Sequence, residues 1–308
     1  MKAAYFDCQF GAAGDMLLGA MLDAGLDREK WLAEIEKIAL PPDSYTIKIQ
    51  QVQRRTLAAK KIDVIVSENA PTEHRHRLEQ SHAHVVSHAH AGSQTYQHPH
   101  KHQYEHDHEH THDHEHTHDH DPPGHNHDHD GPAVAMADVQ AVINNSKISK
   151  FAKELSQKVV ARLGSCEGPV HGMAPEAIYF HEVGAIDTII DIVGFAIAYE
   201  LLGIEKSYVS AVPIGRGHVL TAVGYFPVPA PAVALMLANI KAPTLDYEID
   251  FECLTPTGVA VLAEICDSWG KMPAFAQVQA IGYGAGTIDS PKHPNVCRVM
   301  IGEVSAEI

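Results

Sequence analysis

The feature that most constrains the fold of this chain is a polar segment, from about Pro71 to Pro132, that cannot build a hydrophobic core. It is nearly free of Ile, Leu and Phe, and 20 of the 24 histidines of the 308-residue chain lie between His74 and His129. Such a segment has too little apolar surface to offset the conformational entropy lost on ordering. We therefore expect a long disordered, His/Asp/Glu-rich insertion at residues 71–132, between globular blocks at residues 1–70 and 133–308.

The two flanking blocks show the patterns of alternating strands and helices. Residues 1–70 begin with the strand-like AAYFD and end with YTIKIQQV and KKIDVIV, whose polarity alternates as in strands. In residues 133–308, strands are expected at SYVSAVPI, AFAQVQAIGYGAG and NVCRVMIGEV. The expected fold class is α/β, with mixed sheets and flanking helices. The patterns leave open whether the two blocks form one domain or two.

Terminal signals place the helices. Asp15 suits the positive end of a helix dipole, Gly25 and Gly203 suit helix stops, and Thr255 followed by Pro256 is typical of a helix start. The expected helices are Asp15–Ala24, Arg28–Ala39, Ala135–Ile143, Lys147–Leu163 and Asp187–Leu202, with two more beginning near Ala230 and at Thr255.

Charge and cysteine usage limit the partners and the compartment. The formal net charge is −16, and the segment from Glu73 to Asp130 carries 11 acidic and three basic residues, half of that charge. This balance argues against nucleic acid or an anionic membrane as partner and favours cations. Five cysteines without a CxxC pair indicate a reducing compartment. The N-terminus lacks a signal-peptide-like apolar run, and no stretch reaches the length of a membrane span, so we expect a cytoplasmic protein.

The polar segment predicts metal binding. In an extended chain, alternate side chains point to the same side, so neighbouring imidazoles can converge on one ion. Imidazole suits nickel, copper and zinc, and the absence of thiolate disfavours copper(I). A flexible tract of this kind would load or store metal rather than form a catalytic site; the alternative is a solvated spacer, and the tract does not distinguish nickel from zinc. The proposed metal ligands occupy every second position: His106, His108, His110, His112, His114, His116, His118 and His120.

A second group of polar residues lies in FHEVGAIDTIIDIVG. His181 and Glu182 precede a turn, and Asp187 and Asp191 are four residues apart on one helical face. Such a set could hold a divalent ion or shuttle protons. The alternative is that Asp187 caps the helix and His181 packs in a loop. Asp191 favours a functional role, because an unpaired carboxylate among Ile and Val would be costly.

Four glycine-containing turns are candidates for phosphate binding through backbone amides. Arg216 would add charge-assisted hydrogen bonds. Ordinary turn chemistry is the alternative for each turn. The proposed cofactor-binding residues are Gly11, Gly14, Arg216, Thr255, Thr257 and Gly284. Cys8, just before the first turn, could be a soft metal ligand or a buried, inert thiol.

The chain resembles the nickel-insertion proteins of lactate racemase maturation, the LarC family. The match is carried by YFDCxxGxxGDMLLGAMLDAG, the central histidine-rich insertion, FHEVGAIDTIIDIVG, and then PIGRGHV, FPVPAPA, LTPTG and GYGAG in that order. The ordered series covers essentially the whole chain.

The resemblance implies a metal chelatase of the lyase class. It would insert nickel into pyridinium-3,5-bisthiocarboxylic acid mononucleotide, using CTP and Mg or Mn, to give the nickel-pincer nucleotide of lactate racemase. Family members continue into a C-terminal domain, which some members encode as a separate piece. The resemblance implies this domain and the lactate racemase pathway proteins as partners. We predict an active centre formed by Asp7, Asp15, His181, Glu182, Asp187 and Asp191. The alternatives are a nickel store or metallochaperone without catalytic activity, and a zinc or copper homeostasis protein.

Overall fold

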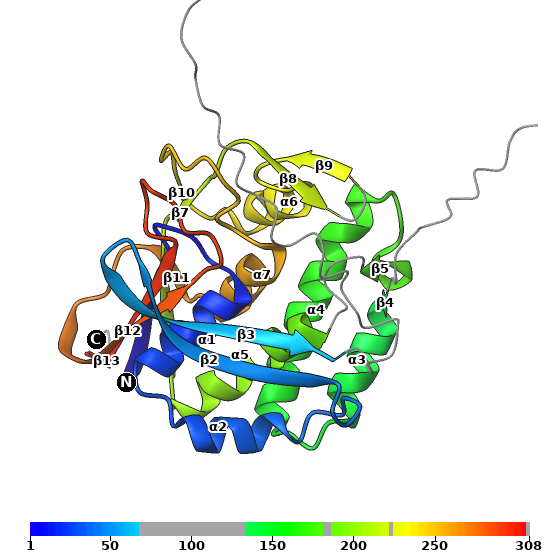
Figure 1. Cartoon of the computed structure of the whole chain (residues 1–308), viewed down its shortest axis with the longest axis horizontal. Helices are drawn as coiled ribbons and strands as arrows, with labels where there is room; N and C mark the ends of the chain where they lie inside the picture. Colours follow the sequence, from blue (N-terminus) through cyan, green and yellow to red (C-terminus); the bar gives the residue numbers. More distant parts are fainter. Residues whose placement is uncertain (68–133, 181–185, 222–223, 306–308) are drawn as a thin grey trace, which may run out of the picture. The chain divides into compact units, whose positions relative to one another are not determined.

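The computed structural model describes residues 1–67, 134–180, 186–221 and 224–305. They form a mixed α/β unit around a seven-stranded sheet with the order β11-β6-β1-β13-β12-β3-β2 (Figure 1). Strands β1, β6 and β11 are parallel to one another, β13 is antiparallel to β1 and β12, and β3 is parallel to β12 and antiparallel to β2. The expected mixed sheet is confirmed, and strands from before residue 68 and after residue 133 share it.

The strands of this sheet are β1 (Lys2–Asp7), β2 (Tyr45–Arg54), β3 (Leu57–Val66), β6 (Lys206–Ser210), β11 (Ser268–Gly270), β12 (Phe275–Ala285) and β13 (Val296–Val304). Three two-stranded pairs lie outside it: β4 (Val134–Ala135) with β5 (Tyr179–Phe180), β7 (Val212–Pro213) with β10 (Thr244–Leu245), and β8 (His218–Thr221) with β9 (Gly224–Pro227).

The helices are α1 (Gly14–Asp23), α2 (Arg28–Ile35), α3 (Met136–Asn145), α4 (Lys150–Val170), α5 (Ile186–Leu201), α6 (Pro231–Ile240) and α7 (Pro256–Ile265), with a short 3₁₀ turn at Pro175–Ala177. None of the helices within the described ranges is both long and apolar enough to cross a membrane.

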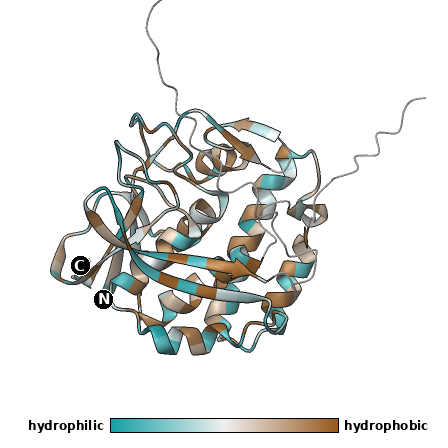
Figure 2. Ribbon diagram, in the orientation of Figure 1, coloured by the Kyte–Doolittle hydropathy of each residue, from teal (hydrophilic) through white to brown (hydrophobic). Residues whose placement is uncertain are grey.

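The main hydrophobic core lies between the helices and one face of the sheet. Ala4, Phe6 and Cys8 of the first strand and its extension join this core together with side chains of α1, α5 and α7. Because strand residues alternate between faces, Tyr5 points to the opposite face, where it packs with Tyr208. Teal and brown positions alternate along β2 and β3 in Figure 2, as expected for strands with one buried side.

Glycines set the close packing of α1 on the sheet, where β3 runs across the front of the helix in Figure 1. A Cβ added at Gly284 of β12 would lie 1.8 Å from the carbonyl oxygen of Met16 in α1. Gly282 on the same strand meets Ala20 O in the same way, at 2.1 Å. Helix and strand backbones therefore touch directly, which fixes the start of α1 relative to β3.

Several boundaries differ from the sequence-based expectation for identifiable reasons. The second helix ends at Ile35 rather than Ala39, because i→i+3 bonds tighten the chain after it. The fourth begins at Lys150, since Ser149 accepts the amide of Ala152, and it continues beyond Leu163 to Val170. The expected strand SYVSAVPI breaks into β6 and β7, which pair in different sheets.

Candidate functional site

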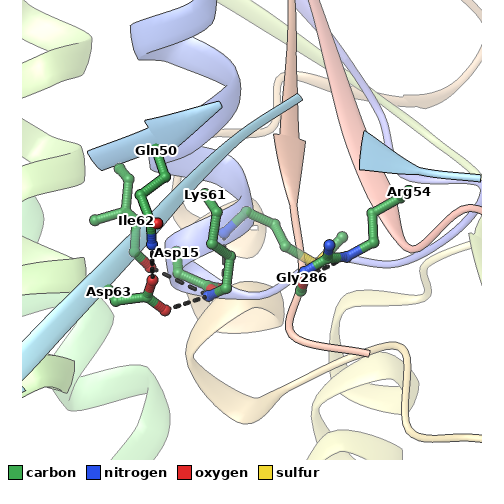
Figure 3. Close-up of polar contacts among 8 residues, drawn as sticks. Asp15, Gln50, Arg54, Lys61, Ile62, Asp63 and Gly286 are labelled. Atoms are coloured by element: carbon green, nitrogen blue, oxygen red, sulfur yellow. Dashed lines mark hydrogen bonds and ion pairs between the residues drawn. The ribbon is translucent and has the colours of Figure 1, made fainter. Parts of the chain in front are cut away.

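A cluster of charged side chains lies where α1 begins beside β3. The Lys61 ammonium of β3 is 2.6 Å from Asp15 Oδ2 on α1 and 3.2 Å from Asp63 Oδ1 two residues along its own strand. Gln50 of β2 donates to the other oxygen of Asp63 at 3.2 Å. Figure 3 shows the carboxylates of Asp15 and Asp63 at the lysine nitrogen, with Gln50 bound to Asp63. Only 9% of the Lys61 side chain is exposed, so this ion pair is shielded from solvent.

Asp191 of α5 completes the cluster from the other side of the α1 N-terminus. The Asp191 carboxyl group lies near the backbone amide of Asp15 at the start of α1. A Cβ on Gly14 would lie 2.6 Å from Asp191 Oδ2 and 2.7 Å from Asp191 Cβ, so only glycine fits here. Ala13, the N-cap residue of α1, provides no side-chain cap. The Asp191 carboxyl group, supplied by a different helix, therefore lies at the N-terminus of α1, where the helix dipole favours negative charge.

The environment favours the protonated form of Asp191. Burial raises its pKa well above the usual aspartate value, and the nearby carboxylates of Asp15 and Asp187 raise it further, while Lys61 and the Asp15 amide oppose this. Burial lowers the pKa of Lys61, but Asp15 and Asp63 outweigh it and raise that pKa overall. An acid next to an ion-paired carboxylate can exchange protons with a bound molecule.

Asp187 lies in the first turn of α5, where its side chain accepts the amide of Thr188 at 2.8 Å. His181 and Glu182, predicted to act with it, lie outside the described residues, as do the eight histidines of the predicted metal tract. In the described ranges, no group of three or more His, Cys, Asp or Glu side chains is arranged to hold a metal ion. The described part of the cluster therefore fits proton transfer better than metal coordination.

Asp7 lies apart from this cluster. It ends β1 on the side of the sheet that carries Tyr5, and it forms an ion pair with Arg298 of β13, its register partner. Its second oxygen, Oδ1, is buried without a hydrogen-bond partner. The carboxylate raises the pKa of Tyr5, which burial brings to about 12. The structure thus groups Asp15, Asp187 and Asp191, but not Asp7.

The glycine turns are engaged mainly with neighbouring backbone. Gly11 and Ala12 donate to the carbonyl oxygens of Cys8 and Cys253. Thr255 caps α7 by accepting the amide of Gly258 at 3.2 Å. These contacts bring the first turn and the start of α7 together. The two amides and the Thr255 hydroxyl therefore bind backbone groups of the protein.

The other predicted cofactor-binding residues are dispersed. Thr257 is buried in the first turn of α7, and Gly284 lies under α1. Arg216, about half exposed, pairs with Asp246 at 2.8 Å and Glu248 at 3.8 Å. Arg54 at the end of β2 donates at 2.7 Å to the carbonyl oxygen of Gly286, the last residue of the GYGAG run (Figure 3).

The thiol pKa is raised in two buried cysteines, Cys8 and Cys253. Cys8 lies 3.8 Å from Cys297, sulfur to sulfur, and both are fully buried. The hydrogen bond to Cys297, together with burial, raises the pKa of Cys8 well above the usual thiol value. Burial raises the pKa of Cys253 to about 12. Metal ligation needs thiolate, so this environment favours the inert alternative for Cys8.

Lys61 and Asp63 were not anticipated as site residues. Their only sequence signal is the run KKIDVIV, in which residues 61 and 63 point to the same side of a strand. The pattern could not show that this side faces α1. Asp191, in contrast, was recognisable as a carboxylate in an apolar helix.

Comparison with known proteins identifies the family. The model of the family described as "Nickel insertion protein" matches residues 4–308, and the chain belongs to this family. Two relatives are named pyridinium-3,5-bisthiocarboxylic acid mononucleotide nickel insertion protein. The one from Geobacillus kaustophilus (strain HTA426) is 33% identical over 98% of this chain and 60% of its own length. The one from Desulfitobacterium hafniense (strain DSM 10664 / DCB-2) is 34% identical over 100% of this chain and 60% of its own length.

A third relative, from Geotalea uraniireducens (strain Rf4) and also named for nickel insertion, is 35% identical over 99% of this chain and 62% of its own length. The chain therefore spans about three fifths of the length of the curated relatives it matches. No solved structure matches it significantly.

Proposed function

We propose that this chain inserts nickel into pyridinium-3,5-bisthiocarboxylic acid mononucleotide, as part of the biosynthesis of the nickel-pincer cofactor of lactate racemase. The observation that carries the proposal is the similarity, along 98–100% of the chain, to relatives named for this insertion. Nickel is a substrate of this reaction, and the reaction class is that of a metal chelatase, a lyase. The proposed setting is the cytoplasm.

The carboxyl cluster of Asp15, Asp187 and Asp191 is proposed to transfer protons during nickel insertion. Metal coordination requires deprotonated ligand atoms, so a donor atom of the substrate that still carries a proton must lose it to a base as nickel binds. Asp191, whose pKa is raised by burial, lies beside the ion-paired Asp15 and would exchange such protons once a substrate is bound. His181 and Glu182 lie a few residues before α5 in the sequence and are proposed to complete this centre with Asp187.

CTP and Mg or Mn are further requirements implied by the family resemblance. The described residues do not fit a divalent-ion site, because none of their acidic, His or Cys groups forms a ligand set of three. The amides of Gly11 and Ala12 already donate to backbone oxygens rather than outward to a phosphate. The described residues of this chain therefore supply no step that passes through CTP or these ions.

The test is reconstituted insertion. The chain would be incubated with the bisthiocarboxylate mononucleotide, nickel, CTP and Mg, with and without the remaining two fifths of a relative, and the product identified by mass spectrometry. We expect nickel-containing nucleotide in the complete mixture, and an Asp191→Asn variant to lower the rate by about 100-fold, the usual contribution of an acid–base group. The exposed Asp138→Asn variant is the matched control. Absence of product from the complete mixture would refute the proposal.

A second candidate, a nickel store or metallochaperone without catalysis, is favoured by one specific observation. Twenty histidines lie within residues 74–129, a composition that binds divalent ions whatever the rest of the chain does. The two functions differ in whether loss of Asp191 or loss of the tract abolishes formation of the nickel nucleotide.

A further inference from the structure

Lys61 occupies a position that neither stability nor solubility explains well. Its ammonium reaches Asp15 Oδ2 at 2.6 Å, Asp63 Oδ1 at 3.2 Å and the carbonyl oxygen of Ile62 at 3.2 Å. The residue is only 7% exposed. Burying an ammonium costs free energy unless several acceptors compensate, and replacing such a group with an apolar side chain is often neutral or stabilising. A buried lysine held by three oxygens at the edge of a carboxyl cluster therefore suggests a task in that cluster.

The contacts define the task. The Asp15 carboxylate pairs with Lys61, and the residue before it, Gly14, lies against Asp191, because a Cβ built on Gly14 would be 2.6 Å from Asp191 Oδ2. Asp15 thus stands between the lysine of β3 and the carboxyl group of α5. We propose that Lys61 is a positioning residue, which clamps the Asp15 carboxylate at the start of α1 beside Asp191 and thereby fixes which carboxyl group of the pair carries the exchangeable proton.

The other charges facing Asp191 act in known directions. Asp15 on α1 and Asp187 on α5 disfavour its ionisation, and Lys61 on β3 favours it. Asp63 binds Lys61 and receives a hydrogen bond from Gln50, so it orients the lysine rather than Asp191 itself. Removing the lysine charge removes a cation that favours ionisation of Asp191, so Asp191 should hold its proton to higher pH.

The role of Lys61 in catalysis rests on the proposed function. Its effect on aspartate ionisation can be measured without any insertion activity. The full chain would be labelled with carbon-13 at the aspartate carboxyl groups, and the ionisation of Asp15 and Asp191 followed by NMR between pH 3 and 9. In Lys61→Met we expect the acid dissociation constant of Asp191 to fall by roughly threefold to tenfold. Lys61→Arg, which keeps the charge, should stay close to the wild type.

Lys60→Met is the matched control, because Lys60 is the adjacent residue and donates only to the carbonyl oxygen of Leu22, at 3.3 Å. It should leave both aspartate titrations unchanged. If Lys61→Met does not fold, as judged by circular dichroism, Lys61→Gln removes the charge while retaining a polar end, and the same shift is expected. Equal titrations in the wild type and the charge-removing variant, or an equal shift in Lys60→Met, would overturn the clamp.

The insertion assay then separates the two ideas. If the clamp and the proposed function both hold, the pH at which insertion becomes fast moves upward in Lys61→Met, in parallel with the NMR shift, and returns in Lys61→Arg. An NMR shift with no change in the insertion profile would retain the clamp and reject the role of this pair in catalysis. Lack of insertion by the wild type would reject the proposed function, while the titration would still decide the clamp.

Discussion

At the scale of single residues, Asp191 is the least expected side chain of the fold. It is a carboxyl group in an apolar helix, where ionisation costs free energy. Its raised pKa means that the folded state binds its proton more tightly than the unfolded state does. Stability linked to this group is therefore greatest at acid pH and falls as pH rises from about 4, the unfolded value, through the folded pKa.

Asp191→Asn should remove this pH dependence. Asparagine keeps an oxygen for the Asp15 amide but has no charge to bury, so we expect the variant to match the wild type near pH 4. At pH 7.5 it should be more stable, by about 1 kcal/mol or a few degrees in Tm. Thermal unfolding at several pH values measures this. A stability difference that does not vary with pH would contradict the explanation, and Asp138→Asn, on the exposed side of α3, controls for loss of net charge.

Asp191 and Lys61 show which buried charged residues can be recognised from the sequence and which cannot. Asp191 was recognisable because its neighbours Ile190 and Ile192 are apolar and predict burial. Lys61 was not, because alternating polar residues in a strand usually face solvent, and only the position of α1 buries this one. A charge that is buried by tertiary packing leaves no local signal.

At the scale of elements, the contact between α1 and β12 positions the whole cluster. Gly284 lies directly under the helix, and the amide of its neighbour Tyr283 donates to Asp23 at the end of α1, at 3.0 Å. Periodicity predicted this helix and both closing strands correctly. It could not predict that β13 separates β1 from β12, because strand order depends on non-local pairing.

Gly284→Ala should therefore destabilise the protein strongly. The added methyl group would lie 1.8 Å from Met16 O, and relieving that overlap means moving α1 away from the sheet. We expect a loss of about 3 kcal/mol or more in the free energy of unfolding, measured by urea denaturation. Gly203→Ala is the control: it has a positive φ of 63° but open space around it, so it should cost only about 1 kcal/mol of backbone strain. Equal losses in the two variants would show that packing under α1 is not the cause.

At the scale of the whole molecule, the candidate site is assembled across the histidine-rich segment. Asp15 and Lys61 precede residue 68, whereas Asp191 follows residue 133. Strands from both sides share one sheet, so the order of elements in the sequence does not follow their order in space. The composition of residues 71–132 indicated an insertion, but only the strand pairing shows that the flanking parts build a common sheet.

This arrangement predicts that the tract and the carboxyl cluster are separable. Replacing residues 71–132 with a Gly/Ser linker of about 20 residues should leave Tm nearly unchanged. The reason is that β3 ends before the replaced residues and β4 begins after them. Equilibrium dialysis should show fewer nickel ions bound per chain. Insertion should persist at saturating nickel and decline several-fold when nickel is limiting, because the tract would raise only the local supply.

A length-preserving variant provides the control for that deletion. Changing the eight alternate histidines between His106 and His120 to Asn removes the imidazoles without altering the connection between β3 and β4. If supply is the role of the tract, this variant should behave like the deletion. If insertion disappears in both even at saturating nickel, the imidazoles belong to the reaction itself, and the separation between a metal-gathering segment and a proton-exchanging cluster is wrong.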